Sequence, residues 1–148
     1  MRVVLQRVAR ASVTVHGELV SAIGPGYLLL VGIGAGDESS DVDRLAEKIV
    51  NLRVFADTDG KMNLALADVD GEALVVSQFT LYGDVRKGRR PSWIGAAEPA
   101  LAAARVEEFA RALEARGVRV GRGIFGAHME VELLNDGPVT LLLDTVDL

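Results

Sequence analysis

Three polar side chains that could take part in chemistry follow an apolar stretch, in Ser77-Gln78-Phe79-Thr80. The preceding residues, Leu74-Val75-Val76, are uniformly apolar, which is typical of a buried strand. A hydroxyl and an amide placed where such a strand ends can face a pocket while the strand holds them in place. The same residues also fit an ordinary edge strand with polar ends, and by themselves they favour that interpretation.

A second unusual segment is Asn135-Asp136-Gly137-Pro138, which lies between two apolar stretches. Glycine supplies backbone angles that other residues avoid, and proline fixes its own φ, so the residue types alone predict a hairpin turn. The residue types by themselves indicate nothing beyond that turn.

The densest basic cluster is formed by Arg86, Lys87, Arg89 and Arg90, in a stretch interrupted by glycine and proline. We expect a surface loop there. Such a cluster can bind phosphates, although a solvated surface is the more ordinary interpretation. The formal net charge of the chain is -5, which argues against a protein that coats nucleic acid. Any contact with RNA must therefore be local.

Several other kinds of site are disfavoured. The chain has no cysteine, so a thiol nucleophile and a thiolate metal site are both excluded. The two histidines, His16 and His128, lack the paired spacing of a metal-binding helix. His128 could act as a base, but a single histidine before a strand is more often a surface or packing residue. The glycines of Gly32–Gly36 do not match a dinucleotide-binding turn. We expect neither a metal nor a cofactor.

The elements that must position these groups can be predicted from the apolar spacing. Helices are expected from Ser40 or Asp41 to Val50 and from Glu98-Pro99 to Gly117. Strands are expected at Val3–Val8, Ser12–Val15, Leu19–Ile23, Tyr27–Ile33, Val54–Ala56, Ala73–Leu81, Val118–Val120, Met129–Leu134 and Val139–Leu143.

Strands and helices do not alternate regularly in this order, which predicts a single α+β domain over residues 1–148. We expect two main helices and a mostly antiparallel or mixed sheet that curls toward a barrel. No apolar run is long enough to span a membrane, and the first residues lack the apolar segment of a signal peptide. A cytoplasmic protein is therefore expected.

Two long segments together resemble the defining motifs of the D-aminoacyl-tRNA deacylases. They are Ser77–Trp93 (SQFTLYGDVRKGRRPSW) and Phe125–Thr140 (FGAHMEVELLNDGPVT). The opening MRVVLQRV and Lys61-Met62-Asn63-Leu64 are also similar to that family. The resemblance covers essentially the whole chain. It implies an enzyme that hydrolyses the ester between tRNA and a D-amino acid. Tyr82-Gly83-Asp84 differs from many bacterial relatives, so the shape of the loop there is open.

The resemblance also implies the assembly and the site. We expect a homodimer in which the S-Q-x-T segment of one subunit faces the Gly-Pro segment of its partner, with active sites at the interface. The pocket residues would be Ser77, Gln78, Phe79 and Thr80, and the cross-subunit element would be Gly137-Pro138 with a cis peptide bond. Phe125 and Met129 are expected near the terminal adenosine of the tRNA acceptor end, Arg7 is expected to support the Gly-Pro element, and Arg86, Lys87, Arg89 and Arg90 are expected to contact tRNA phosphates.

The chemistry implied is attack by water on the ester carbonyl. Because no side-chain triad is visible, backbone N–H groups around Phe79 and Thr80 are the expected donors to the developing oxyanion. Thr80 lacks an obvious neighbouring base and is expected to position the substrate. The 2′-hydroxyl of the tRNA would assist, L-aminoacyl-tRNA would be rejected, and glycyl-tRNA would be accepted to some extent. A non-catalytic RNA-binding module and a hydrolase of another small ester remain the alternatives.

Overall fold

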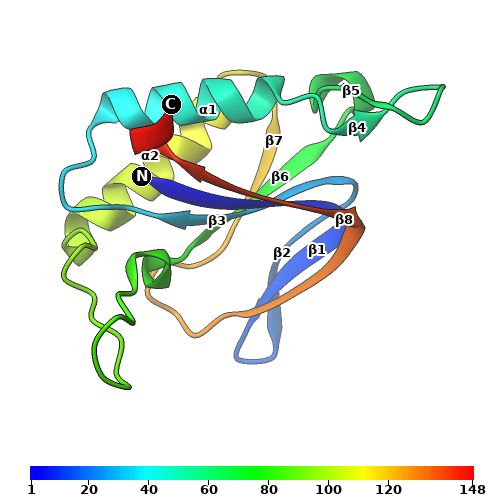
Figure 1. Ribbon diagram of the computed structural model, residues 1–148. Coiled ribbons are helices and arrows are strands. Elements are labelled where there is room, and N and C mark those ends of the chain that lie inside the picture. Colours follow the sequence, from blue (N-terminus) through cyan, green and yellow to red (C-terminus); the bar gives the residue numbers. More distant parts are fainter.

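A computed structural model describes all residues from Met1 to Leu148. One mixed sheet of six strands organises the chain (Figure 1). Its strands are β1 (Arg2–Val15), β2 (Glu18–Ile23), β3 (Gly26–Gly32), β6 (Glu72–Ser77), β7 (Arg119–Arg122) and β8 (Glu130–Asp144). The order is β2-β1-β3-β6-β7, and β8 pairs with β1. β1 is antiparallel to its neighbours, whereas β3, β6 and β7 run parallel to one another. The predicted mixed sheet is confirmed.

The long strand β1 gives the sheet its shape. Its first half pairs with β3, its second half pairs with β2, and β8 follows the opposite edge along nearly the whole length. β2 then approaches β7 so closely that a Cβ atom added to Gly121 would lie 2.3 Å from Oγ of Ser21. Glycine permits this approach, and the sheet is nearly closed into a barrel, as predicted.

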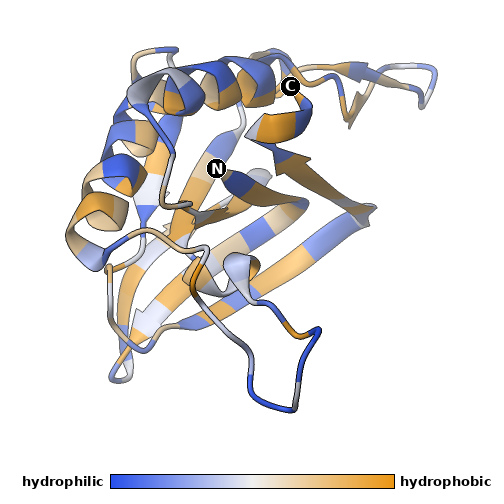
Figure 2. Ribbon diagram, turned by 60° about the vertical axis from the view of Figure 1, so that its left-hand side comes forward, coloured by the Kyte–Doolittle hydropathy of each residue, from blue (hydrophilic) through white to orange (hydrophobic).

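The two predicted helices, α1 (Ser39–Asn51) and α2 (Pro99–Glu114), cover one face of the sheet (Figures 1 and 2). Their buried residues recur at helical spacing and join a core cluster of 22 residues between helices and sheet. A smaller cluster of 7 buried residues fills the inside of the curl. No helix of this fold has the length and apolar character needed to cross a membrane.

The start of α1 differs from the prediction by two to three residues. Its N-cap is Glu38 rather than Ser40 or Asp41. Asp41 lies at the third helical position, where Oδ2 accepts a hydrogen bond from the Glu38 N–H at 3.0 Å. A side chain at this position satisfies an N–H group that the helix leaves free.

The remaining elements are short. The strands β4 (Phe55–Ala56) and β5 (Met62–Leu64) form a hairpin that extends beyond the end of α1 (Figure 1). Three 3-10 helices complete the fold, namely η1 (Ala67–Val69), η2 (Phe79–Tyr82) and η3 (Thr145–Asp147). Val3–Val8 and Ser12–Val15 were expected as separate strands but form the continuous strand β1.

Candidate active site

The segment Ser77–Thr80 begins where β6 ends. The Gln78 N–H still donates to the carbonyl of Val31 in β3 at 2.7 Å, and the Leu81 N–H then donates to Gln78 O at 3.2 Å, which closes the turn of η2. The predicted strand to Leu81 is therefore wrong after Ser77. The physical reason is that β3 ends at Gly32, so residues beyond Gln78 have no strand edge to pair with.

The turn η2 exposes its first half. The side chain of Phe79 is 55% exposed, and Thr80 is also exposed. The first N–H groups of any helical turn lack partners inside the turn, so the amides of Phe79 and Thr80 have no acceptor within η2. Nε2 of Gln78 donates a hydrogen bond to Oγ1 of Thr80. An amide nitrogen cannot accept the Thr80 proton, so this contact orients the hydroxyl without activating it.

A cavity of about 440 Å³, here called the aromatic cavity, lies beside η2. Its wall includes the rings of Phe79, Trp93 and Phe125 together with Ser77. The rings of Phe79 and Trp93 meet edge to face, with centroids 5.2 Å apart and planes at 71°. On the other side of Phe79, a cavity of about 250 Å³ is lined by residues that include Gln78 and Met129. Phe125 and Met129 thus both border η2, in neighbouring cavities.

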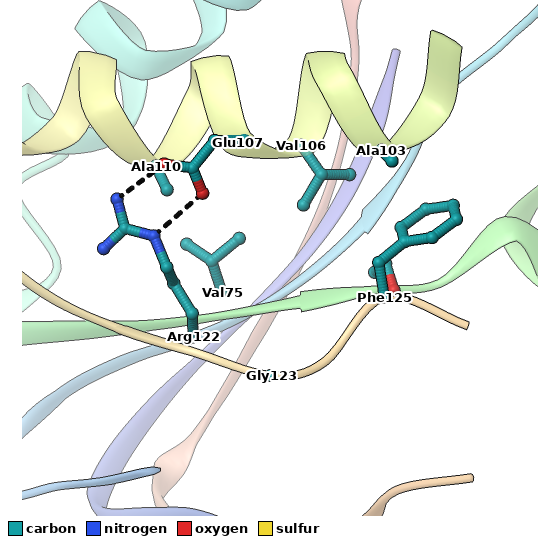
Figure 3. Close-up of a pocket in the computed structure, with 9 residues that line it drawn as sticks. Val75, Ala103, Val106, Glu107, Ala110, Arg122, Gly123 and Phe125 are labelled. Atoms are coloured by element: carbon teal, nitrogen blue, oxygen red, sulfur yellow. Dashed lines mark hydrogen bonds and ion pairs between the residues drawn. The ribbon is translucent and has the colours of Figure 1, made fainter. Parts of the chain in front are cut away.

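Behind Phe125, a smaller cavity of about 160 Å³ continues between β6 and α2 (Figure 3). Ser77 and Phe125 line this cavity as well as the aromatic cavity. Its far end is closed by Arg122, which binds Glu107 of α2 through Nε at 3.0 Å and Nη2 at 3.3 Å. Arg122 also contacts Glu114 at 2.7 and 2.9 Å. The guanidinium holds the pKa of both carboxyl groups below their ordinary values.

The Gly137-Pro138 segment is a bulge within β8, not the hairpin turn that the residue types predict. β8 pairs with β1 on both sides of it, because Thr140 lies opposite Gln6 and Asn135 lies opposite Val8. The side-chain amide of Asn135 closes the base of the bulge by donating to the carbonyls of Arg7 at 2.9 Å and Val139 at 3.0 Å.

The two residues at the tip of the bulge are exposed. The Gly137-Pro138 peptide bond is cis, and Gly137 has a φ of +136°, a region that favours glycine. The tip therefore presents backbone and a proline ring, with no long side chain.

Arg7 supports this bulge from β1. Its Nε donates to the carbonyl of Asp136 at 3.0 Å, and its Nη1 donates to the carbonyl of Val54. The Arg7 side chain is only 12% exposed. Because a Cβ atom on Gly137 would lie 2.9 Å from Nη2 of Arg7, the guanidinium packs directly against the glycine.

Within one chain, η2 and the bulge do not meet. Figure 1 shows the bend of β8 at one end of the sheet and η2, the short green helix, at the other. No residue from 135 to 140 lines either cavity beside η2. The two segments that the sequence singled out therefore form separate sites on the same chain.

The basic cluster lies on the loop that follows η2, drawn mostly blue in Figure 2. Arg86 is already paired, because its Nε and Nη2 bind the carboxylate of Asp84 at 2.9 and 2.7 Å. Lys87, Arg89 and Arg90 are exposed. None of these three forms an ion pair within the chain, so their charges are available to a ligand.

Comparison with known proteins decides the family. A sequence model described as D-Tyr-tRNA(Tyr) deacylase matches residues 4–144. A protein from Chloroflexus aurantiacus named D-aminoacyl-tRNA deacylase is 60% identical over 148 residues, which covers 100% of this chain and 92% of that protein. One of the same name from Thermomicrobium roseum is 61% identical and covers 100% of this chain and 96% of its own length. This chain belongs to the D-aminoacyl-tRNA deacylase family.

Solved structures show the same fold around the deacylase site. A structure titled c-Myc DNA Unwinding Element Binding Protein is 42% identical to this deacylase, covers 97% of this chain and 98% of its own, and superposes with a TM-score of 0.90. A structure described as a probable eukaryotic D-amino acid tRNA deacylase is 19% identical, covers 96% of this chain and 97% of its own, and has a TM-score of 0.82. The second likeness concerns the fold alone.

The segment Tyr82-Gly83-Asp84, whose loop shape the sequence left open, has a defined shape. Tyr82 ends η2, with its ring beneath the guanidinium of Arg2. Gly83 lies so close to the ring of Trp93 that an added Cβ atom would come within 2.8 Å of it. Residue types alone did not indicate Trp93 as a cavity residue, although it lies within the matched segment.

Proposed function

We propose that this protein hydrolyses the ester that joins a D-amino acid to the terminal adenosine of tRNA and leaves L-aminoacyl-tRNA intact. The observation that carries this proposal is that Ser77 and Phe79, from the family's motif Ser77–Thr80, form part of the wall of the aromatic cavity. The function is thus a proofreading step that removes D-amino acids from tRNA. Since aminoacyl-tRNA is consumed in translation, we place the enzyme in the cytoplasm.

The aromatic cavity suits the terminal adenosine. Its volume of about 440 Å³ is within the range of small-ligand pockets. Rings of Phe79, Trp93 and Phe125 offer faces and edges on which a purine can stack. The carboxylate of Glu98, also in the wall, can accept a hydrogen bond from the exocyclic amine. In this arrangement the ribose and its ester face η2.

The backbone N–H groups of η2 would then stabilise the transition state. As water attacks the carbonyl, negative charge develops on its oxygen, and the N–H groups of Phe79 and Thr80 are the donors that stabilise it. The Thr80 hydroxyl, held by Gln78, positions the substrate. The 2′-hydroxyl next to the ester takes part in transferring the proton that the attacking water loses. The site therefore needs no side-chain base. The proposed reaction involves no metal and no cofactor.

We further propose that the active enzyme is a homodimer whose sites combine η2 of one subunit with the bulge of the other. Three features support this assembly. The bulge is exposed, it is distant from η2 of its own chain, and exposed leucines lie on either side of it, with Leu134 48% and Leu142 71% exposed. A second copy would cover this apolar surface. Sedimentation of active enzyme as a 15.7 kDa monomer would disprove the composite site.

The bulge would provide the chiral selection. Its tip carries only backbone and the proline ring, so it can approach the Cα atom of the substrate closely. The side chain of an L-amino acid would occupy the space that the tip fills, whereas a D-amino acid directs its side chain outward. Selectivity then arises from exclusion of the wrong enantiomer. Glycine has no side chain to exclude, and some hydrolysis of glycyl-tRNA is expected.

The tRNA acceptor end would be held by the basic loop. Lys87, Arg89 and Arg90 are unpaired and exposed, and they can contact phosphates without reading bases. Arg86 would contribute less, because Asp84 already neutralises it.

One set of assays tests the function. Purified protein is given D-tyrosyl-tRNA, L-tyrosyl-tRNA and D-tyrosyl methyl ester at equal concentrations. We expect rapid release of tyrosine from the first substrate alone. Comparable hydrolysis of the methyl ester would indicate a general ester hydrolase. Binding of tRNA without hydrolysis would indicate an RNA-binding module. Glycyl-tRNA, tested alongside, should be hydrolysed faster than in buffer.

A further inference from the structure

We propose that Arg2 and Tyr82 are positioning residues that hold η2 in its reactive place. The proposal rests on the proposed function, because it assigns the purpose of this pair to the backbone donors of Phe79 and Thr80. Neither residue touches the aromatic cavity, so both act through η2.

Arg2 contacts the second half of η2 in two ways. Its Nη1 donates to the carbonyl of Leu81 at 3.0 Å. Its guanidinium carbon lies 4.5 Å from the centre of the Tyr82 ring, a distance typical of a cation–π contact. The same guanidinium donates through Nε to Oδ2 of Asp144, near the end of β8, at 2.7 Å. Arg2 therefore joins η2 to the start of β1 and the end of β8.

Tyr82 is fixed from its other side. Its hydroxyl lies 3.4 Å from Oδ2 of Asp37, an oxygen that also accepts the Gly34 N–H at 2.5 Å. A Cβ atom on Gly34 would lie 2.8 Å from the Tyr82 hydroxyl, so the ring packs directly on this backbone. Burial raises the pKa of Tyr82, and its neutral hydroxyl remains a donor at physiological pH.

This support is needed because η2 is short. A 3-10 helix of four residues has little stability of its own. Its orientation must come from tertiary contacts, and those of Arg2 and Tyr82 lie at Leu81 and Tyr82. Phe79 and Thr80, which face the substrate, are exposed. An error of about 1 Å in the placement of a catalytic group can lower a rate by about 100-fold.

The charge of Arg2 argues against a direct role in binding tRNA. Asp144 neutralises it at 2.7 Å, and Leu81 occupies a second donor. Its variants should therefore change kcat and leave KM nearly constant. A residue that bound phosphate would change KM instead.

The test uses Arg2→Met, Tyr82→Leu and the double variant, assayed on D-tyrosyl-tRNA. Each single variant should lower kcat about tenfold with KM within about twofold. The double variant should lower kcat by less than the product of the two single effects, because the contact between Arg2 and Tyr82 is lost in both single variants. Arg119→Met is the matched control and should behave as the wild type. The carboxylates nearest to Arg119 are 4.0 and 3.9 Å away, so this arginine forms only weak ion pairs. Arg2→Lys keeps the charge but not the planar fork and should be intermediate.

Trp93 supplies a measurement independent of activity. It is the only tryptophan, and its ring contacts Phe79 of η2. Its fluorescence emission should shift in Arg2→Met and Tyr82→Leu, and not in Arg119→Met, while the far-ultraviolet circular dichroism stays constant. If either large change prevents folding, Arg2→Lys and Tyr82→Phe serve for the same comparison.

The outcomes separate the two proposals. If the wild type does not hydrolyse D-tyrosyl-tRNA, the proposed function is wrong, and the emission of Trp93 still shows whether Arg2 and Tyr82 hold η2. If the wild type is active and the variants keep its kcat and its emission, the positioning proposal is wrong. A rise in KM at constant kcat would also overturn it, by making Arg2 a contact for the substrate.

Discussion

The Nε atom of Arg7 donates to the backbone carbonyl of Asp136 at 3.0 Å, while its Nη1 donates to the carbonyl of Val54. One guanidinium thus connects the bulge of β8 with the segment that enters β4. Two fixed donors at defined angles are a property of arginine that lysine lacks. The bulge owes its fixed direction to this side chain and to Asn135.

Replacing Arg7 by Met should therefore loosen the bulge. We expect kcat/KM on D-tyrosyl-tRNA to fall by about 10- to 100-fold, with a smaller ratio between the D- and L-substrates. Arg7→Lys can satisfy only one of the two carbonyls and should remain impaired. Arg10→Met is the control on the same strand, because Arg10 is exposed and its only ion pair is at 3.9 Å. Unchanged discrimination in Arg7→Met would separate Arg7 from chiral selection.

The basic loop should govern the salt dependence of tRNA binding. Removing one cation that binds a phosphate lowers the slope of log K against log salt by about 0.7 to 0.9. Replacing Lys87, Arg89 and Arg90 by Gln should thus lower the slope by about 2 to 3. Arg86→Gln alone should change it less, because Asp84 pairs with Arg86 at 2.7 Å.

Asp84→Asn gives the opposite test of this loop, since it releases Arg86 and should steepen the slope. Titrations of uncharged tRNA at several salt concentrations measure all these variants. A triple variant with the wild-type slope would mean that the loop is a solvated surface without a role in binding.

The ion pairs of Arg122 should make stability depend on pH. The pKa values of Glu107 and Glu114 are held below the ordinary value of 4.5, first by hydrogen bonds from Arg122. A carboxyl whose pKa is lower in the folded state stabilises the fold above the unfolded pKa, and this stabilisation is lost as the pH falls through the folded value. The melting temperature should therefore fall as the pH decreases below the ordinary value of 4.5.

Arg122→Met provides the comparison. It should melt below the wild type at pH 7, and the difference between the two proteins should shrink as the pH falls below about 4.5. Melting curves by circular dichroism at several pH values measure both effects. A difference that is the same at pH 7 and pH 3 would show that Arg122 stabilises the fold by packing alone.

Local patterns predicted the helices and the mixed sheet well. Val42, Leu45, Ala46 and Ile49 are buried on α1, as their spacing indicated. Two of the strand errors have a common cause, because both depend on where a distant partner ends. The strand stops at Ser77 since β3 stops at Gly32. Likewise, Asn135-Asp136-Gly137-Pro138 has the composition of a turn, and only the length of β1 makes it a bulge.

For the site, too, contacts between residues far apart in the sequence could not be predicted. Ser77 to Thr80 and Gly137-Pro138 could be predicted from the resemblance, because those residues lie in contiguous motifs. The contact from Arg2 to Leu81 spans 79 positions and the contact from Tyr82 to Asp37 spans 45. Neither contact produces a pattern in the local sequence. The contacts that hold η2 could therefore be seen only in the folded chain.

Thr80→Ala should keep much of its activity, about a fifth of the wild-type rate. The hydroxyl accepts its hydrogen bond from the amide of Gln78, and loss of one such bond corresponds to about a fivefold change in rate. Loss of a true nucleophile costs on the order of a millionfold in kcat. Single-turnover assays on D-tyrosyl-tRNA distinguish the two. A folded variant without activity, together with a tyrosyl ester on Thr80 of the wild type by mass spectrometry, would make Thr80 the nucleophile.

If each site combines two subunits, a heterodimer of two inactive variants should recover activity. Phe125→Glu places a charge in the aromatic cavity, which should prevent adenosine from stacking and inactivate the η2 side. Gly137→Val adds a side chain whose Cβ atom would lie 2.9 Å from Nη2 of Arg7, which should displace the bulge. The two variants are co-expressed with different tags, and the heterodimer is purified through both tags. It contains one site with an intact η2 and an intact bulge. Because the two sites of a symmetric dimer are equivalent, this heterodimer should show about half the wild-type activity. Each variant co-expressed with itself under the two tags is the control and should stay inactive. A heterodimer as inactive as its parents would mean that η2 and the bulge do not act across subunits.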